Sequence, residues 1–118
     1  MTSHTILVVD DSRVSRMLIR AIIAHADPQA TVIEASNGEE ALAKIETTPI
    51  TVATLDLNMP GMDGLVLAKE LLSRFPSAKI GLLTANIQEM VRQKADALGI
   101  SFISKPITEE KILNFIYG

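Results

Sequence analysis

The sequence contains no cysteine, which excludes disulfide bridges, thiolate metal sites and cysteine nucleophiles. Aromatic residues are scarce, at 3% of 118 residues against a hydrophobic share of 47%, so any core must be aliphatic. No apolar run is long enough to span a bilayer, and the opening Met-Thr-Ser-His lacks the charged start of a signal peptide. We therefore expect a cytoplasmic protein, which agrees with the lack of cysteine.

A strong charge bias is also missing. The net charge is −3, and no one-sided basic footprint of a nucleic-acid-binding protein is present. We therefore expect neither a nucleic acid nor a membrane as a partner. The length predicts a single domain over residues 1–118, large enough to bury a core without disulfide or metal support.

Short apolar runs alternate with segments of helical periodicity along the whole chain. Ser12 is placed to cap the first helix, Pro28 follows its end, and Gly99 ends the fourth helix. We expect strands at 5–10, 31–35, 51–56, 79–84 and 101–104, and helices at 13–26, 38–47, 65–75, 87–98 and 107–117. This alternation predicts an α/β fold, with a parallel sheet covered by helices on both faces.

Polar side chains stand where the predicted strands end. They are Asp10 and Asp11 after the first strand, Asp56 on the third, Thr84 on the fourth and Lys105 after the fifth. In an open parallel sheet these ends line one crevice, so the five side chains should converge. Three neighbouring carboxylates repel one another, and a hard divalent cation such as Mg²⁺ relieves that repulsion.

The same residue types suit phosphoryl transfer, which depends mainly on positioning and electrostatics. Lys105 supplies a point charge for one phosphate oxygen, and Thr84 can donate a hydrogen bond to another. Asp56 remains as the nucleophile, which would form an acyl phosphate.

Four segments carry a resemblance to a known family. They are residues 6–12 (ILVVDDS), 55–64 (LDLNMPGMDG), 82–85 (LLTA) and 102–106 (FISKP). In this order and on these strands, they resemble the response-regulator receiver domain of two-component signalling, over about residues 5–117. The resemblance implies a flavodoxin-like (βα)5 three-layer sandwich with strand order 2-1-3-4-5, the order found in chemotaxis receivers.

The resemblance also implies a role for each acid. Asp56 would accept the phosphoryl group from a histidine kinase or histidine phosphotransfer protein. Asp11, Asp56 and the backbone carbonyl of Asn58 would ligate Mg²⁺, and Asp10 would act mostly through bound water. The domain would catalyse only its own phosphorylation and dephosphorylation, and would otherwise not be an enzyme.

Four more residues receive roles from the resemblance. Thr84 would be the switch hydroxyl that moves toward the phosphoryl group, and Phe102 would be the switch aromatic that turns inward with it. Lys105 would bind the phosphate, and Pro106 would form the Lys-Pro bond that is often cis in this family. Phe102 lacks a tyrosine hydroxyl, so its outward state has no hydrogen bond to gain.

Two surfaces are expected to meet partners. An unknown downstream protein would bind the fourth helix, fifth strand and fifth helix, where we expect exposed Glu89, Arg92, Phe102 and Ser104. The kinase would read the first helix, around Arg13, Val14, Arg16 and Met17. The chain would be a monomer or a phosphorylation-dependent dimer.

Simpler interpretations stand beside these. The acid pair could only cap a helix, Asp56 could be a solvated strand end, and Thr84 an ordinary strand residue. Phe102 could be core filling, and Lys105 a surface lysine. His4 and His25 have no partner at metal or catalytic spacing, which predicts surface residues.

Other function classes fit less well. A Mg²⁺-dependent phosphatase with an aspartate nucleophile would place a second acid two residues further on, whereas position 12 is serine, and a cap insertion is missing. A nucleotide-binding module would need a glycine-rich loop after the first strand, which the sequence lacks. The chain could also be one part of a longer regulator.

Overall fold

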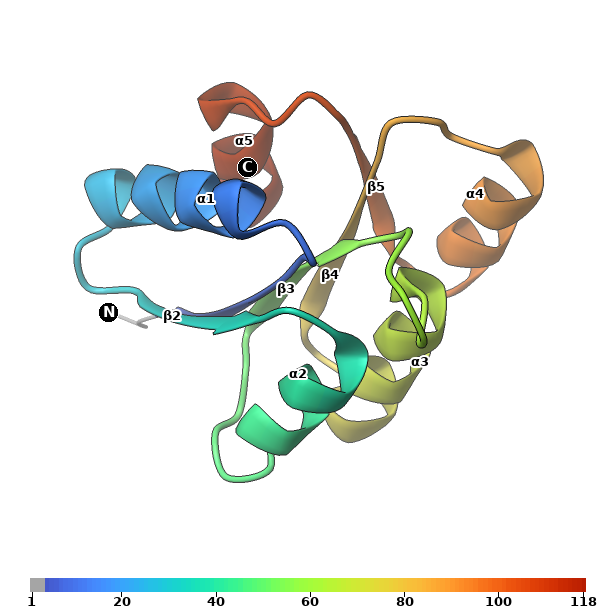
Figure 1. Cartoon of the computed structure of the whole chain (residues 1–118), viewed down its shortest axis with the longest axis horizontal. Helices are drawn as coiled ribbons and strands as arrows, with labels where there is room; N and C mark the ends of the chain where they lie inside the picture. Colours follow the sequence, from blue (N-terminus) through green and yellow to red (C-terminus); the bar gives the residue numbers. More distant parts are fainter. Residues whose placement is uncertain (1–3) are drawn as a thin grey trace.

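The predicted strands form one parallel sheet. The computed structural model describes residues 4–118, and its strand order is β2-β1-β3-β4-β5 (Figure 1). The strands are β1 (Thr5–Val9), β2 (Thr31–Ala35), β3 (Val52–Asp56), β4 (Lys79–Thr84) and β5 (Ser101–Ser104). This confirms the expected flavodoxin-like order. The prediction about a signal peptide concerns the start of the chain, where residues 1–3 lie outside the described residues.

The helices agree with the predicted pattern except at their ends. They are α1 (Arg13–Ala26), α2 (Gly38–Lys44), α3 (Gly64–Arg74), α4 (Glu89–Ala97) and α5 (Glu109–Tyr117). The last three predicted residues of α2, the first two of α4 and α5, and the last one of α3 and α4 fall outside the helices, and α3 begins one residue earlier than predicted. For α5 the reason is a cap, since the Thr108 side chain accepts a hydrogen bond from the Lys111 amide and so fixes the start. Within residues 4–118, every helix is too short or too polar to cross a membrane.

The helices cover the sheet in two layers. Helices α1 and α5 lie on one face, and α2, α3 and α4 lie on the other (Figure 1). Successive strand residues serve opposite faces, so Ile6 and Val8 pack under α1 and α5, while Leu7 and Val9 pack under α2 and α3. Both faces of the strand are apolar because both are covered.

The strand register brings the polar strand ends to one edge. Asp56 at the end of β3 lies opposite Leu83, one residue before the end of β4. Thr84 lies opposite Ser104 at the end of β5, and the Lys105 amide donates to the Thr84 carbonyl at 2.9 Å. Strand β1 is the other neighbour of β3, so the residues that follow it reach the same edge. The strand register therefore brings Asp56, Thr84, Lys105 and the residues after β1 to the same edge of the sheet.

At the opposite edge, the two ends of the described chain contact each other. The His4 ring packs edge-on against Tyr117, with ring centroids 5.4 Å apart, and its Nδ1 shares a hydrogen bond with Thr51 Oγ1 at 3.0 Å. His4 is therefore half-buried, with structural partners that the sequence did not predict, whereas His25 is exposed as predicted. The Tyr117 hydroxyl donates to Asp27 Oδ2 at 2.7 Å, which ties α5 to the segment after α1.

This tie predicts a pH dependence of stability at alkaline pH. Burial and the neighbouring Asp27 carboxylate raise the pKa of Tyr117 from 10.0 to about 12. Because the folded pKa is the higher one, the tyrosine contributes its stabilisation fully below pH 10 and loses it between pH 10 and about 12. Tyr117→Phe should lower the free energy of unfolding by about 1 kcal/mol at neutral pH, and the difference should shrink across that window.

Urea denaturation of the two proteins from neutral to alkaline pH measures this difference. The chain has one tyrosine, so the ultraviolet absorbance of tyrosinate follows this single group directly. A titration midpoint near the ordinary tyrosine value, or a difference that stays constant with pH, would refute the prediction.

Candidate functional site

Asp56 lies at the buried end of the central strand β3. All five residues of β3 are buried, and Asp56 is only 5% exposed, so the alternative of a solvated strand-end acid is wrong. Its Oδ1 accepts hydrogen bonds from Lys105 Nζ at 3.4 Å and from the Asn58 amide at 3.3 Å. Within residues 4–118 we find no hydrogen bond to Oδ2, which leaves this oxygen free for chemistry.

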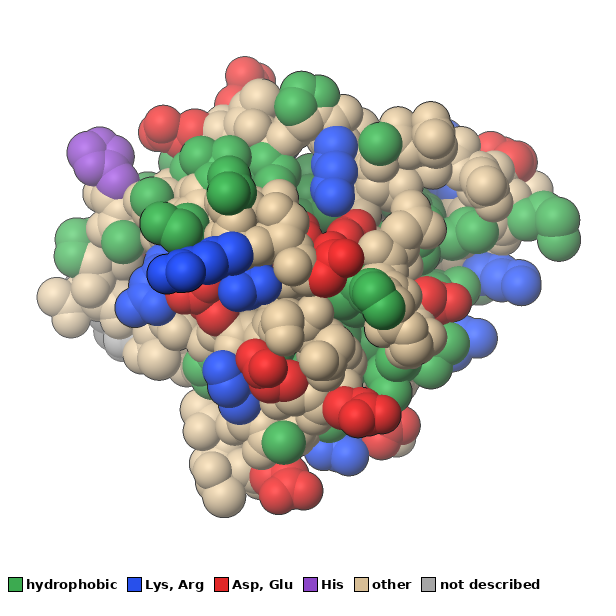
Figure 2. Space-filling view, in the orientation of Figure 1, with side chains coloured by type: hydrophobic (Ala, Val, Ile, Leu, Met, Phe, Trp, Pro, Cys, Tyr) green, Lys and Arg blue, Asp and Glu red, His purple; other side chains and the backbone are tan. Residues whose placement is uncertain are grey.

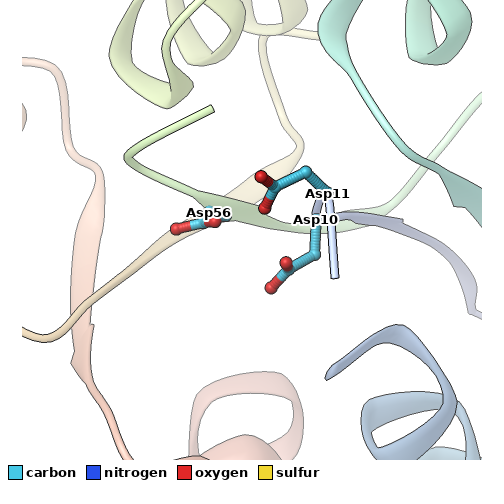
Figure 3. Close-up of side chains that lie close together, drawn as sticks. All are labelled: Asp10, Asp11 and Asp56. Carbon is cyan, nitrogen blue, oxygen red and sulfur yellow. The ribbon is translucent and has the colours of Figure 1, made fainter. Parts of the chain in front are cut away.

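The acid pair after β1 faces Asp56. Figure 3 shows the carboxylates of Asp10, Asp11 and Asp56 gathered around a common space, and oxygen atoms of all three lie within 4.8 Å of one another. Asp10 is fully buried and Asp11 is exposed. The helix cap is Ser12, whose side chain accepts from the Ser15 amide, so the interpretation of the acids as mere caps is wrong.

Burial and mutual repulsion both act on these carboxylates. Burial is the main cause that raises the pKa of Asp10, and the charges of Asp56 and Asp11 raise it further against the opposing Ser12 amide and Lys105. Burial also raises the pKa of Asp56, although Lys105 and the Asn58 amide oppose it. Keeping Asp10 and Asp56 charged therefore lowers the stability of the fold, and a bound cation would offset this loss.

The residues fit a hard divalent cation. Asp10 Oδ1 accepts from the Ser12 amide at 2.8 Å, but its Oδ2 is buried and, among the described residues, has no hydrogen-bond partner. An unpartnered buried carboxylate oxygen is costly unless a cation or water lies beside it. With two further carboxylates at hand, the donor set is all oxygen, as Mg²⁺ prefers.

This geometry predicts that Asp10→Asn stabilises the protein when no cation is present. The amide keeps an acceptor for the Ser12 amide, removes one buried charge and offers a donor to the neighbouring carboxylates. In EDTA the free energy of unfolding should rise by about 1–3 kcal/mol. In Mg²⁺ the advantage should shrink, because the wild type gains more from cation binding. Urea denaturation in both buffers measures the two differences.

Asp96→Asn is the matched control, because it makes the same chemical change at an exposed position in α4. It should change the free energy of unfolding by less than about 0.5 kcal/mol in either buffer. An Asp10→Asn protein that is less stable than wild type in EDTA would contradict the prediction.

Lys105 and Thr84 lie at the same edge of the sheet as the three acids. Lys105 is half-buried and forms an ion pair with Asp56, so it lies on the same rim as the acids and is not a plain surface lysine. Figure 2 shows acidic side chains at the centre of this face with a basic side chain beside them. The buried Thr84 hydroxyl donates to the Asn86 carbonyl at 2.9 Å and accepts from the Asn86 amide at 3.2 Å. Thr84 therefore has to give up a hydrogen bond before it can donate toward Asp56.

Three further predicted residues lie close by. The peptide bond between Lys105 and Pro106 is cis. Asn58 is exposed two residues after the end of β3, and its amide donates to Asp56 Oδ1 at 3.3 Å. Phe102 is half-buried and packs against the core beneath α3 and α4, so the expectation of an exposed Phe102 is wrong. Because Phe102 packs against the core, its position agrees with core filling as well as with the role of a switch aromatic.

The two expected partner surfaces are mostly exposed. Glu89, Arg92 and Ser104 are exposed on α4 and β5. On α1, Arg13, Val14 and Met17 are exposed, with 75% of Val14 and 56% of Met17 open to solvent.

Arg16 differs from the other predicted residues on α1. It is half-buried and turns inward, and its Nη1 donates to the Asp10 carbonyl at 2.7 Å. Sequence reasoning missed this contact. The only signal for it was that Arg16 lies one helical turn after Ser12, which places it beside the loop but does not say which way it points.

Comparison with known proteins identifies the family. The sequence profile described as "Response regulator receiver domain" matches residues 6–117. The chain belongs to the response regulator receiver domain family. Receiver domains are the signal-receiving modules of two-component systems, and this receiver domain is of the chemotaxis CheY type.

Individual relatives agree with this assignment over nearly the whole receiver domain. The chemotaxis protein CheY of Listeria monocytogenes is 35% identical over 109 residues, which is 92% of this chain and 91% of that protein. The structure of CheY4 from Vibrio cholerae, crystallised at low pH, superposes with a TM-score of 0.86 at 28% identity and covers 96% and 95% of the two chains. A response regulator from Burkholderia pseudomallei, solved with a phosphorylated aspartic acid and a calcium ion, gives a TM-score of 0.86 at 26% identity, over 97% of this chain and 66% of that one.

Proposed function

We propose that this receiver domain is a phosphoacceptor, in which Asp56 takes a phosphoryl group from a phosphohistidine of a kinase or phosphotransfer protein. The observation that carries the proposal is the Asp56 carboxylate, which is buried, is held by Lys105 through Oδ1, and faces the acid pair with its other oxygen free. The Burkholderia response regulator, whose structure contains a phosphorylated aspartic acid and a calcium ion, supports this assignment.

The reaction is a transfer between two nucleophiles. The free Oδ2 of Asp56 attacks the phosphorus atom, the P–N bond to the donor histidine breaks with its electron pair going to the ring nitrogen, and an acyl phosphate forms. Mg²⁺, bound by Asp11, Asp56 and the Asn58 carbonyl, would neutralise charge on the transferred group. Asp10 would act mostly through water. The domain turns over no other substrate in this proposal, and catalyses only its own phosphorylation and dephosphorylation.

Lys105 and Thr84 hold the transferred group. The Lys105 ammonium already lies 3.4 Å from Asp56 Oδ1, and can move to a phosphate oxygen with a small change of a flexible side chain. Thr84 exchanges its hydrogen bond to the Asn86 carbonyl for one to another phosphate oxygen. Because the same hydroxyl serves both partners in turn, phosphorylation pulls on the segment that leads into α4.

That movement gives the signal its output. The segment before α4 shifts with Thr84, and Phe102 repacks beside it, so the face formed by α4, β5 and α5 changes shape for a downstream protein. The exposed Glu89, Arg92 and Ser104 make this face polar, which favours transient binding. The kinase docks on α1 next to the acids, where Arg13, Val14 and Met17 are exposed.

Incubation with acetyl phosphate and Mg²⁺, followed by intact-mass measurement, tests the proposal. We expect a gain of one phosphoryl group that hydroxylamine removes, as it does for an acyl phosphate, and that EDTA prevents. Peptide mapping should place the group on Asp56. A protein that stays unmodified, or that carries the group on a serine or threonine, would refute the proposal.

A further inference from the structure

Arg16 on α1 makes a hydrogen bond to the backbone of the acid pair Asp10 and Asp11. Asp10 and Asp11 are joined by one peptide group, and the orientation of that group decides where the Asp11 carboxylate points. The Asp10 amide donates to the Ala35 carbonyl of β2 at 3.1 Å, and the Asp10 carbonyl accepts from Arg16 at 2.7 Å. Both backbone groups of Asp10 are therefore held by hydrogen bonds, the amide by β2 and the carbonyl by the first turn of α1.

Arg16 is itself held in place by Glu34 of β2. Its Nε lies 3.4 Å from Glu34 Oε1, while Arg20 Nη1 lies 2.8 Å from Glu34 Oε2. On the face drawn in Figure 2, basic side chains gather next to an acidic one over α1 and β2. The Arg16 side chain is 16% exposed and the Glu34 side chain 25% exposed, so the pair is better shielded from water than the exposed ion pairs elsewhere on the chain.

The chemistry of arginine matters for this contact. A guanidinium group presents separate N–H donors in a rigid plane, so Nη1 can serve the carbonyl while Nε serves Glu34. A lysine has one nitrogen at the end of a flexible chain and cannot hold both partners in a fixed geometry. Arg20 offers an internal comparison, because it binds the same Glu34 but, within residues 4–118, makes no hydrogen bond to the Asp10 backbone.

We infer that Arg16, held by Glu34, is a positioning residue that fixes the Asp10–Asp11 peptide so that both carboxylates face Asp56. This inference rests on the proposed function, because it assigns Arg16 to the cation and phosphoryl site and not to kinase recognition. The polar contacts of Arg16 are with the Asp10 carbonyl and with Glu34, and not with the carboxylates that face Asp56. It acts through the backbone between the two acids, as the outer partners of metal ligands do.

Four variants test the inference. Arg16→Met removes both anchors, Arg16→Lys keeps the charge and one anchor, and Glu34→Gln keeps an acceptor without the charge. Arg20→Met is the matched control, since it breaks the shorter ion pair to Glu34 and leaves the Asp10 carbonyl contact in place. Circular dichroism and urea denaturation establish which variants are folded.

The Mg²⁺ dissociation constant of the unphosphorylated protein, measured by calorimetry, is the first readout. Arg16→Met should weaken Mg²⁺ binding by about tenfold or more, the usual effect of losing a partner that orients a metal ligand. Arg16→Lys and Glu34→Gln should lie in between, and Arg20→Met should stay within about twofold of wild type. Equal affinities for the Arg16→Met and Arg20→Met proteins would overturn the inference.

Amide hydrogen exchange in EDTA is the second readout, and it needs no cation. The amides of Asp11 and Ser12 should exchange faster in Arg16→Met and Arg16→Lys than in wild type, while Arg20→Met leaves them unchanged. Unchanged exchange in both Arg16 variants would refute the inference even if the wild type bound no Mg²⁺. If Arg16→Met does not fold, Arg16→Lys carries the test.

The two proposals fail in different ways. A wild type that takes no phosphoryl group from acetyl phosphate refutes the proposed function, while cation binding and amide exchange still decide the role of Arg16. A wild type that is phosphorylated, together with Arg16 variants that match it in Mg²⁺ affinity and amide exchange, refutes the positioning role alone.

Discussion

Asp56→Asn is expected to abolish phosphoryl uptake, the largest functional loss that any single substitution in this chain should cause. The amide has the same size and still accepts hydrogen bonds from the Asn58 amide and Lys105 through Oδ1. It lacks the anionic oxygen that attacks phosphorus. Loss of a covalent nucleophile lowers rates on the order of 10³-fold or more, so the mass of one phosphoryl group should be undetectable after incubation with acetyl phosphate and Mg²⁺.

The fold of this variant should be intact. Burial already disfavours the charged form of Asp56, and Asp11 repels it, so a neutral side chain costs no stability in EDTA. Asp96→Asn serves again as the control, since it makes the same change at an exposed position of α4 and should be phosphorylated like wild type. A folded Asp56→Asn protein that still gained a phosphoryl group would place the acceptor elsewhere.

The convergence of the site could be predicted because it follows from topology. Once the alternating pattern implies a parallel sheet, every strand ends at the same edge, and residues far apart in sequence must meet there. This reasoning placed Asp56, Lys105 and the acid pair together, and the structure has their atoms within a few ångströms. The same reasoning could not separate Asp10 from Asp11, although one is fully buried and the other exposed, because their burial depends on how the chain leaves β1.

Side-chain direction is the part that the sequence could not predict. Helical spacing put Arg16 beside the loop, but its inward turn depends on Glu34, which comes from a different strand. The contact of His4 with Tyr117 joins opposite ends of the chain, and no local pattern links them. Phe102 was expected to be exposed as part of the partner surface on the fourth helix, fifth strand and fifth helix, whereas it is half-buried against the core.

Gly64 is another residue whose importance appears only in three dimensions. It begins α3, directly after the cap residue Asp63, and its amide donates to the Leu57 carbonyl at 2.9 Å. A Cβ at this position would lie 2.5 Å from the Asp56 carbonyl oxygen and 2.9 Å from Leu57 Cα. Both are backbone atoms of the segment that carries Asp56, the proposed phosphoacceptor, so they cannot give way without moving Asp56.

Gly64→Ala is therefore expected to lower the free energy of unfolding by about 2–4 kcal/mol, the upper range for overpacking at a site that cannot relax. Gly99→Ala is the control, because Gly99 has a φ of +74° but nothing within 4 Å of a new Cβ, so only backbone strain of about 1–2 kcal/mol should result. Urea denaturation compares the two. At temperatures where Gly64→Ala remains folded, its phosphoryl uptake should also be slower than that of Gly99→Ala, since only the first change displaces Asp56. Equal losses of stability together with equal uptake rates would show that the loop before α3 yields to the extra methyl group, and that the position of Asp56 does not depend on the close approach at Gly64.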